Sequence, residues 1–153
     1  MEKNQLNPID MLILRELTAD ARIPFTQLAK KLKVSNTLVH QRIKKLKDSG
    51  ILLNATIHLD PWKLGYQTSA YTQIMLTDAK AHREVEKELA KIPEVVECVN
   101  ISGRYALLIK IFALNNRHLR DIIYEKIHPI SGVEGTNTTI SFELAFVRNV
   151  PLG

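Results

Sequence analysis

Hydrophobic residues recur at helical spacing along the first fifty residues. Ile9, Ile13 and Leu17 stand at i, i+4 and i+8 after Asn7-Pro8, a pair typical of a capped helix start. A second short helix is predicted over residues 25–32, after the break at "ADARIP". Leu28, Ala29 and Leu32 of this segment are expected to face inward, and the small Ala29 would let a neighbouring helix come close.

A third helix is predicted from a Ser35 cap to about Asp48, with Gly50 as its stop signal. Val39, Ile43 and Leu46 share one face, which suits packing on the first two helices. The opposite face carries hydroxyl, imidazole, amide and ammonium groups, from Thr37, His40, Gln41 and Lys44.

Alternating patterns dominate after residue 50. Residues 51–60 are predicted to be extended and to form a wing-like hairpin, and "DPWKLGY" is predicted to be a turn and linker. The remainder has the order β-α-β-β-α-β of a ferredoxin-like domain. Strands are predicted at 67–77, 95–101, 105–113 and 136–147, and helices over "AHREVEKELAKI" and "NNRHLRDIIYEKI".

These patterns predict an α+β protein of two domains. Residues 1–60 form a winged helix-turn-helix, 61–66 a linker and 67–153 a ferredoxin-like domain. Two helices cover only one face of a four-stranded sheet, so we expect a partner copy to bury the other face.

Composition supports a folded protein outside the membrane. The hydrophobic fraction is 45%, and no apolar run reaches the roughly 18 residues of a membrane span. "MEKNQLNPID" has no signal-peptide character, so we expect a cytoplasmic location. The single cysteine, Cys98, lies in the apolar run "EVVECVNI", where we expect a buried thiol.

Charge separates the two predicted domains. Residues 1–60 hold ten Lys/Arg against six Asp/Glu, a net +4, whereas 61–153 hold eleven against ten, a net +1. No acidic residue occurs from Ala21 to Lys47. A basic segment of this kind is suited to a polyanion, and in a helix-turn-helix the third helix enters the major groove of DNA.

The predicted contacts to double-stranded DNA therefore lie on and before the third helix. Lys30, Lys31 and Lys33 are expected to contribute phosphate or long-range charge, without contacting base edges. Arg42 lies at the edge of the apolar face, and both a DNA contact and a structural role are open for it. The candidate set is Ser35, Asn36, Thr37, His40, Gln41, Arg42, Lys44 and Lys45.

The sequence does not indicate a metal site or a catalytic centre. No two of the five histidines stand at i, i+4, and none is near Cys98 in sequence. A Gly-rich phosphate loop and a G-x-S-x-G motif are both lacking. We therefore expect no catalytic residue, no cofactor and no metal.

An ordered set of motifs along the whole chain resembles the Lrp/AsnC family of bacterial and archaeal regulators. The motifs are "LRELTADARIPFTQLAKKLKVSNTLVHQRIKKLKDSGIL", "LDPWKLG", "VNISGRYALLIKI" and "GVEGTNTTIS". The resemblance implies dimers formed through the sheet, often assembled into tetramers or octamers. It also implies a pocket for a small-molecule effector, usually an amino acid, between subunits.

The effector pocket implied by the resemblance departs from the family pattern at one position. The family has a Gly-x-aromatic-Asp turn whose Asp holds the amino group of an amino acid; Gly103 and Tyr105 match, but Ala106 replaces the Asp. Glu134 or Glu143 could supply the missing charge, or the register could differ by one residue. The implied pocket set is Gly103, Arg104, Tyr105, Ala106, Asn116, Thr136, Thr138 and Ile140.

The sequence thus predicts a homo-oligomeric, sequence-specific transcriptional regulator that binds a pseudo-palindromic operator and senses a metabolite. Two alternatives remain open. One is a family-related haem-biosynthesis decarboxylase, which a basic C-terminal pocket would favour. The other is an architectural nucleoid protein without an effector.

Overall fold

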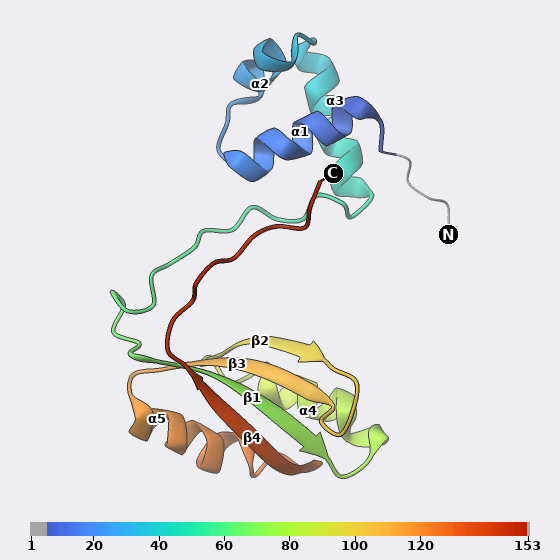
Figure 1. The fold of residues 1–153 in the computed structure, drawn as a ribbon. Coiled ribbons are helices and arrows are strands. Elements are labelled where there is room, and N and C mark those ends of the chain that lie inside the picture. Colours follow the sequence, from blue (N-terminus) through green and yellow to red (C-terminus); the bar gives the residue numbers. More distant parts are fainter. Residues whose placement is uncertain (1–5, 153) are drawn as a thin grey trace. The chain divides into compact units, whose positions relative to one another are not determined.

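The computed structural model describes residues 6–152 and divides into two compact units. Residues 1–5 and 153, at the outer ends of the predicted domains, lie outside the described part. The first unit comprises the chain up to His58 together with the segment from Val147 onward, and the second runs from Leu59 to Phe146. The two units are shown in Figure 1.

Three helices form the first unit: α1 (Pro8–Ala19), α2 (Phe25–Leu32) and α3 (Asn36–Asp48). Asn7 caps α1 and exchanges hydrogen bonds with Asp10 in a capping box. Ser35 caps α3, accepting a hydrogen bond from the Leu38 amide at 3.1 Å. The predicted helices and caps are confirmed. Their shared core consists of Ile13, Leu14, Ile23, Leu28, Ala29, Val39, Ile43 and Leu46.

The segment after α3 differs from the prediction. Residues 53–60 carry no strand assignment, so the expected hairpin is not formed by paired strands within this chain. Leu53, Ile57 and Leu59 are exposed there. Alternating hydrophobicity favours an extended backbone, but a strand also needs a hydrogen-bonding neighbour.

The second unit is a four-stranded antiparallel sheet with strand order β2-β3-β1-β4. The strands are β1 (Thr68–Leu76), β2 (Val95–Asn100), β3 (Leu107–Ala113) and β4 (Val133–Ser141). A 3₁₀ turn, η1 (Ala79–Ala81), and helix α4 (His82–Leu89) follow β1. Helix α5 (Asn116–Asp121) continues as a π-helical turn, η2 (Ile122–Ile127). The predicted ferredoxin-like order is confirmed.

The last strand ends earlier than predicted. β4 stops at Ser141, which pairs with Ser69 close to the start of β1. Phe142, Leu144 and Phe146 continue the alternating pattern, but they follow the last pair of β4 with β1 and are exposed. The prediction of a strand to residue 147 was therefore wrong because hydrophobic periodicity continues past the last backbone partner.

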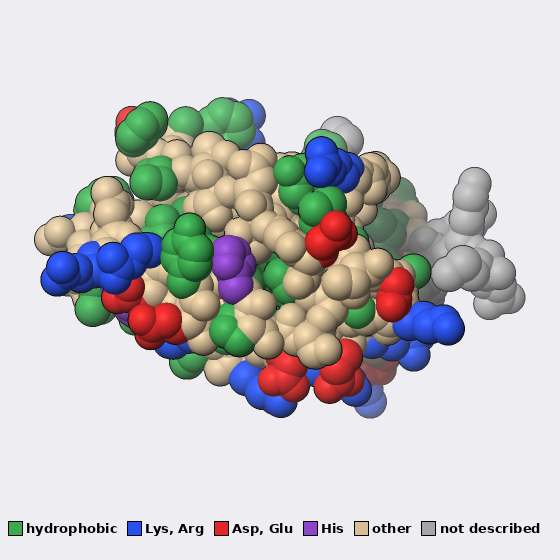
Figure 2. All heavy atoms as spheres, turned by 90° about the horizontal axis from the view of Figure 1, so that it is seen from below, with side chains coloured by type: hydrophobic (Ala, Val, Ile, Leu, Met, Phe, Trp, Pro, Cys, Tyr) green, Lys and Arg blue, Asp and Glu red, His purple; other side chains and the backbone are tan. Residues whose placement is uncertain are grey.

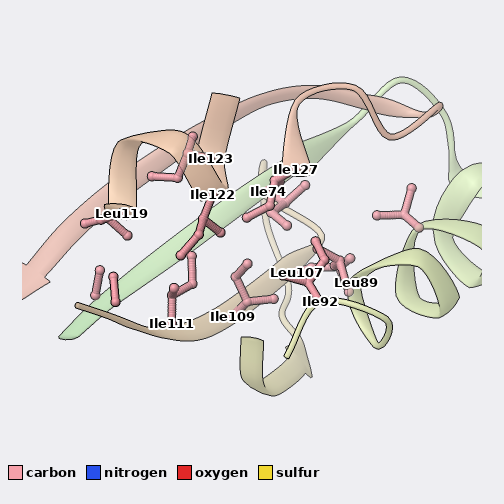
Figure 3. Close-up of a cluster of buried hydrophobic side chains, with 13 residues drawn as sticks. Ile74, Leu89, Ile92, Leu107, Ile109, Ile111, Leu119, Ile122, Ile123 and Ile127 are labelled. Atoms are coloured by element: carbon pink, nitrogen blue, oxygen red, sulfur yellow. The ribbon is translucent and has the colours of Figure 1, made fainter. Parts of the chain in front are cut away.

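Helices α4 and α5 cover one face of the sheet and bury its core (Figure 1). In β3 the residues Leu107, Ile109 and Ile111 are fully buried and alternate with partly exposed ones. Figure 3 shows these side chains meeting Ile122, Ile123 and Ile127 from the helical layer. The isoleucine run of "IIYEKI" thus anchors the π-helical turn to the sheet.

Cys98 is exposed, so the prediction of a buried thiol was wrong. β2 is an edge strand with β3 as its single neighbour, and most of its residues are exposed. Partial desolvation of the sulfur and the carboxylate of Glu86 both raise the pKa of the Cys98 thiol, which disfavours a reactive thiolate.

Candidate DNA-binding and effector sites

The candidate DNA-binding face is the side of α3 that points away from the first core. Val39, Ile43 and Leu46 are buried on the inner side. The exposed positions of α3 offer amide, hydroxyl, imidazole and ammonium donors, from Asn36, Thr37, His40, Gln41, Lys44 and Lys45. Packing of the apolar stripe therefore orients these side chains outward along one rigid helix.

Two of the predicted contact residues also have local roles. The Ser35 hydroxyl is occupied as the α3 cap, which makes the residue a positioner of the helix N-terminus. The His40 ring meets Phe25 edge-on, with ring centroids 4.9 Å apart, and this contact joins α3 to the start of α2. His40 remains exposed beside that contact.

Arg42 forms a part-buried ion pair with Asp10. Its Nε donates to Asp10 Oδ1 at 2.7 Å, and its Nη2 donates to Oδ2. The Arg42 side chain is only 19% exposed and that of Asp10 only 3%. The ion pair gives Arg42 a structural contact that ties α3 to α1.

Asp10 is a buried charged residue near the candidate face whose partners sequence reasoning missed. Its carboxylate also accepts the Asn7 amide at 3.0 Å, so one side chain caps α1 and binds Arg42. The hydrogen bond from Arg42 holds the pKa of Asp10 below its usual value, although burial opposes this. The available signal was a carboxylate among Ile9, Ile13 and Leu14 on the apolar side of a helix, with an arginine at the edge of another apolar face.

The lysines on α2 and in the turn before α3 differ in their surroundings. Lys31 is paired with Glu16 of α1, whereas Lys30 and Lys33 are exposed on α2 and the turn that follows it. The face of the molecule in Figure 2, in contrast, mixes basic (blue) and acidic (red) side chains around hydrophobic ones. Residues 21–47, which include no acidic residue, all belong to the first unit.

The turn between β2 and β3 carries the first group of candidate effector residues. Gly103 adopts φ +108°, a conformation that favours glycine. Arg104 lies over Met75, with Nε 3.4 Å from Sδ. Ala106 donates its amide to the Ile74 carbonyl at 2.9 Å and packs, partly buried, against the second core.

Candidate residues on β4 and α5 already make hydrogen bonds within the chain. Thr138 Oγ1 lies 2.9 Å from Thr72 Oγ1, and Thr136 Oγ1 lies 2.9 Å from His128 Nε2. Asn116 Oδ1 accepts from Thr68 Oγ1 at 2.9 Å. A ligand contacting these groups would therefore share or replace existing bonds.

One chain does not bring all eight candidates together. Ala106 and Thr136 both neighbour Ile74, at one end of β1. Asn116 and Ile140 lie at the other end, next to Thr68 and Ala70. Thr68 and Ile74 are six positions apart along β1, about 20 Å, and Thr138, which pairs with Thr72, lies between them. The set is thus spread along β1 in the second unit.

A part-buried carboxylate links α5 and the π-helical turn to the segment before β2. Glu94 Oε1 lies 2.8 Å from Lys126 Nζ and 3.5 Å from His118 Nε2, while His118 Nδ1 accepts the Leu114 amide. Burial opposes ionisation of Glu94, but the ammonium of Lys126 keeps its pKa below the usual value.

The acids considered as replacements for the missing aspartate are Glu134 and Glu143, and both are exposed. Within residues 6–152 there is no group of three or more His, Cys, Asp or Glu side chains placed to hold a metal ion. Among these residues no helix combines the length and the apolar character that a membrane span requires.

Comparisons with known proteins agree with this architecture. Residues 6–52 match the family described as winged helix-turn-helix DNA-binding, and residues 69–149 match the Lrp/AsnC ligand binding domain. The regulatory protein AsnC of Haemophilus influenzae is 33% identical over 147 residues, which cover 96% of this chain and 98% of that protein. The HTH-type transcriptional regulator FL11 of Pyrococcus horikoshii is 35% identical over 135 residues, 88% of each chain.

The fold is also shared with a solved relative over nearly the whole length. The structure of Escherichia coli AsnC superposes with a TM-score of 0.88 at 29% identity, covering 95% of this chain and 98% of that one. Both halves of the protein therefore match the same kind of regulator, in the same order. The chain belongs to the Lrp/AsnC family of DNA-binding transcriptional regulators.

Proposed function

We propose that this regulator is homo-oligomeric and sequence-specific, with the exposed face of α3 contacting base edges in the major groove. Thr37, His40, Gln41 and Lys44 supply the base contacts, while Lys45 and the lysines of α2 contact phosphates. The observation that carries the proposal is the exposed face of α3, which has no acidic residue before Asp48 at its end, opposite a packed apolar stripe. Arg42 positions α3 against α1 through its ion pair with Asp10.

Substitutions on α3 are expected to separate base contacts from phosphate contacts. Gln41→Ala should relax base preference at one operator position, by about 1–3 kcal/mol for a lost base contact. Lys45→Ala should weaken binding to all sequences and flatten the salt dependence by about one unit of slope. Genomic mapping of binding sites supplies the operator, and titrations at several salt concentrations against operator and random DNA measure both effects.

Lys91→Ala is the matched control for charge, because Lys91 is exposed in the second unit and paired with Glu88. Lys91→Ala should change neither the base preference nor the salt dependence of binding. If Gln41→Ala and His40→Ala both leave discrimination intact, α3 does not contact bases. If the wild-type protein itself binds operator and random DNA equally, the architectural alternative holds instead.

The second unit is proposed to assemble the oligomer and to bind a small metabolite. The face of the sheet that lacks helices carries Tyr71, Leu108 and Phe112, all partly exposed. Lys110 lies over the rings of Tyr71 and Phe112, at 5.6 and 5.2 Å from their centroids. A sheet face of this composition is suited to burial against a second copy, and two-fold pairing would bind a pseudo-palindromic operator.

Residues 67–153 contain the second core, so we expect them to fold alone. We expect them to dimerise through the sheet face that lacks helices. Phe112→Asp should yield monomers by placing a carboxylate in the paired sheet faces. Tyr124→Asp, on a 64% exposed residue of the π-helical turn, is the control and should remain dimeric. Light scattering at micromolar concentration measures the mass, and a wild-type monomer would contradict both the interface and the two-fold operator.

An effector pocket is proposed at the ends of β1, completed by more than one chain. The candidate residues are spread along about 20 Å of β1, so a pocket shared between copies would bring separated members of the set together. No acidic side chain belongs to the set, and the second unit is near neutral. A near-neutral pocket also suits a metabolite better than the carboxylates of a tetrapyrrole, and tetrapyrrole titration followed by absorbance tests that decarboxylase alternative directly.

A further inference from the structure

The end of the chain returns to the DNA-binding unit. Residues from Val147 onward belong to the first compact unit, although the chain reaches them directly from β4 of the second (Figure 1). Leu152 packs against the core formed by α1, α2 and α3. Its carbonyl accepts a hydrogen bond from Arg15 Nη2 of α1 at 3.4 Å. The sequence placed these residues in the second domain and gave no sign of this contact.

We propose that α1 is a docking surface for the C-terminal segment, residues 142–152, and that this segment is a second tether on the DNA-binding unit. The docking surface comprises Arg15 and Thr18, beside which Val147, Val150 and Leu152 lie. The first tether is the linker after α3. The docking is independent of the proposed function, whereas its consequence for operator binding rests on it.

Chain length makes the C-terminal segment the shorter tether. Leu152 follows the end of β4, Ser141, by eleven positions, a reach of about 40 Å when fully extended. Along the linker, Thr68 of β1 follows Leu52, the last residue packed on the first core, by sixteen positions, a reach of about 55 Å. Whenever Leu152 is docked, it therefore limits how far the DNA-binding unit can move.

The docking is light enough to be reversible. Val147 and Val150 are 67% and 77% exposed, so Leu152 provides most of the apolar burial in the segment. A segment with few buried contacts opens locally at low free-energy cost. Because β4 carries Thr136, Thr138 and Ile140, a ligand at that strand would act on the chain that leads directly to the docked residue.

The tether is tested in the full-length protein by two insertions of six Gly/Ser residues. One lies between Phe142 and Glu143, both exposed, and lengthens the tether without changing the docking residues. The other, between Leu53 and Asn54, is the matched control in the linker, which is already the longer connection. Leu152→Asp removes the docking itself, and Val150→Asp is its exposed control.

Backbone ¹⁵N relaxation measures how independently the first unit tumbles. The C-terminal insertion and Leu152→Asp are expected to shorten the correlation time of α1–α3 relative to the sheet, whereas the linker insertion and Val150→Asp leave it unchanged. Should Leu152→Asp unfold the first unit, the C-terminal insertion still decides the question. Equal effects of the two insertions, or no effect of the C-terminal one, would overturn the tether.

Operator binding provides a second readout. Releasing the tether should weaken binding to DNA with two half-sites by about two- to tenfold, because the effective concentration of the second DNA-binding unit falls. Binding to DNA with a single half-site should be unaffected. An unchanged two-site affinity together with altered relaxation would overturn the consequence for DNA while the docking stands. A wild-type protein that does not discriminate operator DNA contradicts the proposed function, and the relaxation experiment still tests the docking.

Discussion

Replacing Asp10 by asparagine is expected to destabilise the DNA-binding unit by about 2–4 kcal/mol at neutral pH. The substitution leaves the guanidinium of Arg42 without its anionic partner in a site where that side chain is only 19% exposed. Removing one member of a buried pair costs about 3–5 kcal/mol, and the partial exposure of Arg42 reduces the figure. Amide hydrogen exchange of α1 and α3 measures the loss in the full-length protein.

The effect should depend on pH in one direction. The pKa of Asp10 is lowered in the folded protein, so its contribution to stability is fully present above the unfolded value of about 3.9. It is lost as the pH falls through the folded value. The difference between wild type and Asp10→Asn should therefore be constant from about pH 5 to 7 and shrink below about pH 4.

Asp48→Asn is the control, because Asp48 is exposed at the end of α3. It should change the unfolding free energy by less than about 0.5 kcal/mol. Arg42→Ala distinguishes positioning from DNA contact: the folded fraction should retain the wild-type salt slope. A slope reduced by about one unit would mean that Arg42 contacts a phosphate.

Local patterns predicted the helices and strands of both units because each spacing of hydrophobic residues fits one type of secondary structure. Val39, Ile43 and Leu46 stand at helical spacing, and burial of that face leaves a single orientation for α3. Leu107, Ile109 and Ile111 alternate, and one register places all three in the core. The order of these elements then determined the ferredoxin-like sheet.

Features that depend on distant partners were not predictable in the same way. The Asp10–Arg42 pair joins residues 32 positions apart, and only the packing of α1 on α3 brings them together. The end of β4 depends on where β1 begins, and the exposure of Cys98 depends on β2 being an edge strand. Leu152 is one apolar residue in an irregular tail, and no periodicity indicates that it packs on α1.

The second large expected effect concerns amino-acid binding at Ala106. The wild-type protein is expected to bind every standard amino acid more weakly than about 10 µM, roughly 7 kcal/mol of binding free energy. An amino acid brings an ammonium group, and burying it without an anionic partner costs several kcal/mol. The turn at Ala106 offers none, and Arg104, lying over Met75, adds positive charge nearby.

Ala106→Asp should restore the missing partner and strengthen amino-acid binding, whereas Ala106→Asn, nearly the same shape without the charge, should not. The backbone can tolerate both changes, because the turn is held by main-chain hydrogen bonds from Ala106 to Ile74 and from Ile101 to Ala106. Calorimetric titration with the twenty amino acids measures binding, and thermal unfolding shows whether either variant only weakens the fold.

Equal affinities of the two variants for amino acids would mean that the side chain at position 106 does not face the ligand. A wild-type dissociation constant of about 10 µM or tighter would mean that another group, such as Glu134 or Glu143 of a neighbouring chain, holds the ammonium. If only Ala106→Asp gains affinity, the wild-type protein either binds ordinary amino acids weakly, or senses a metabolite without a free ammonium, or regulates without an effector.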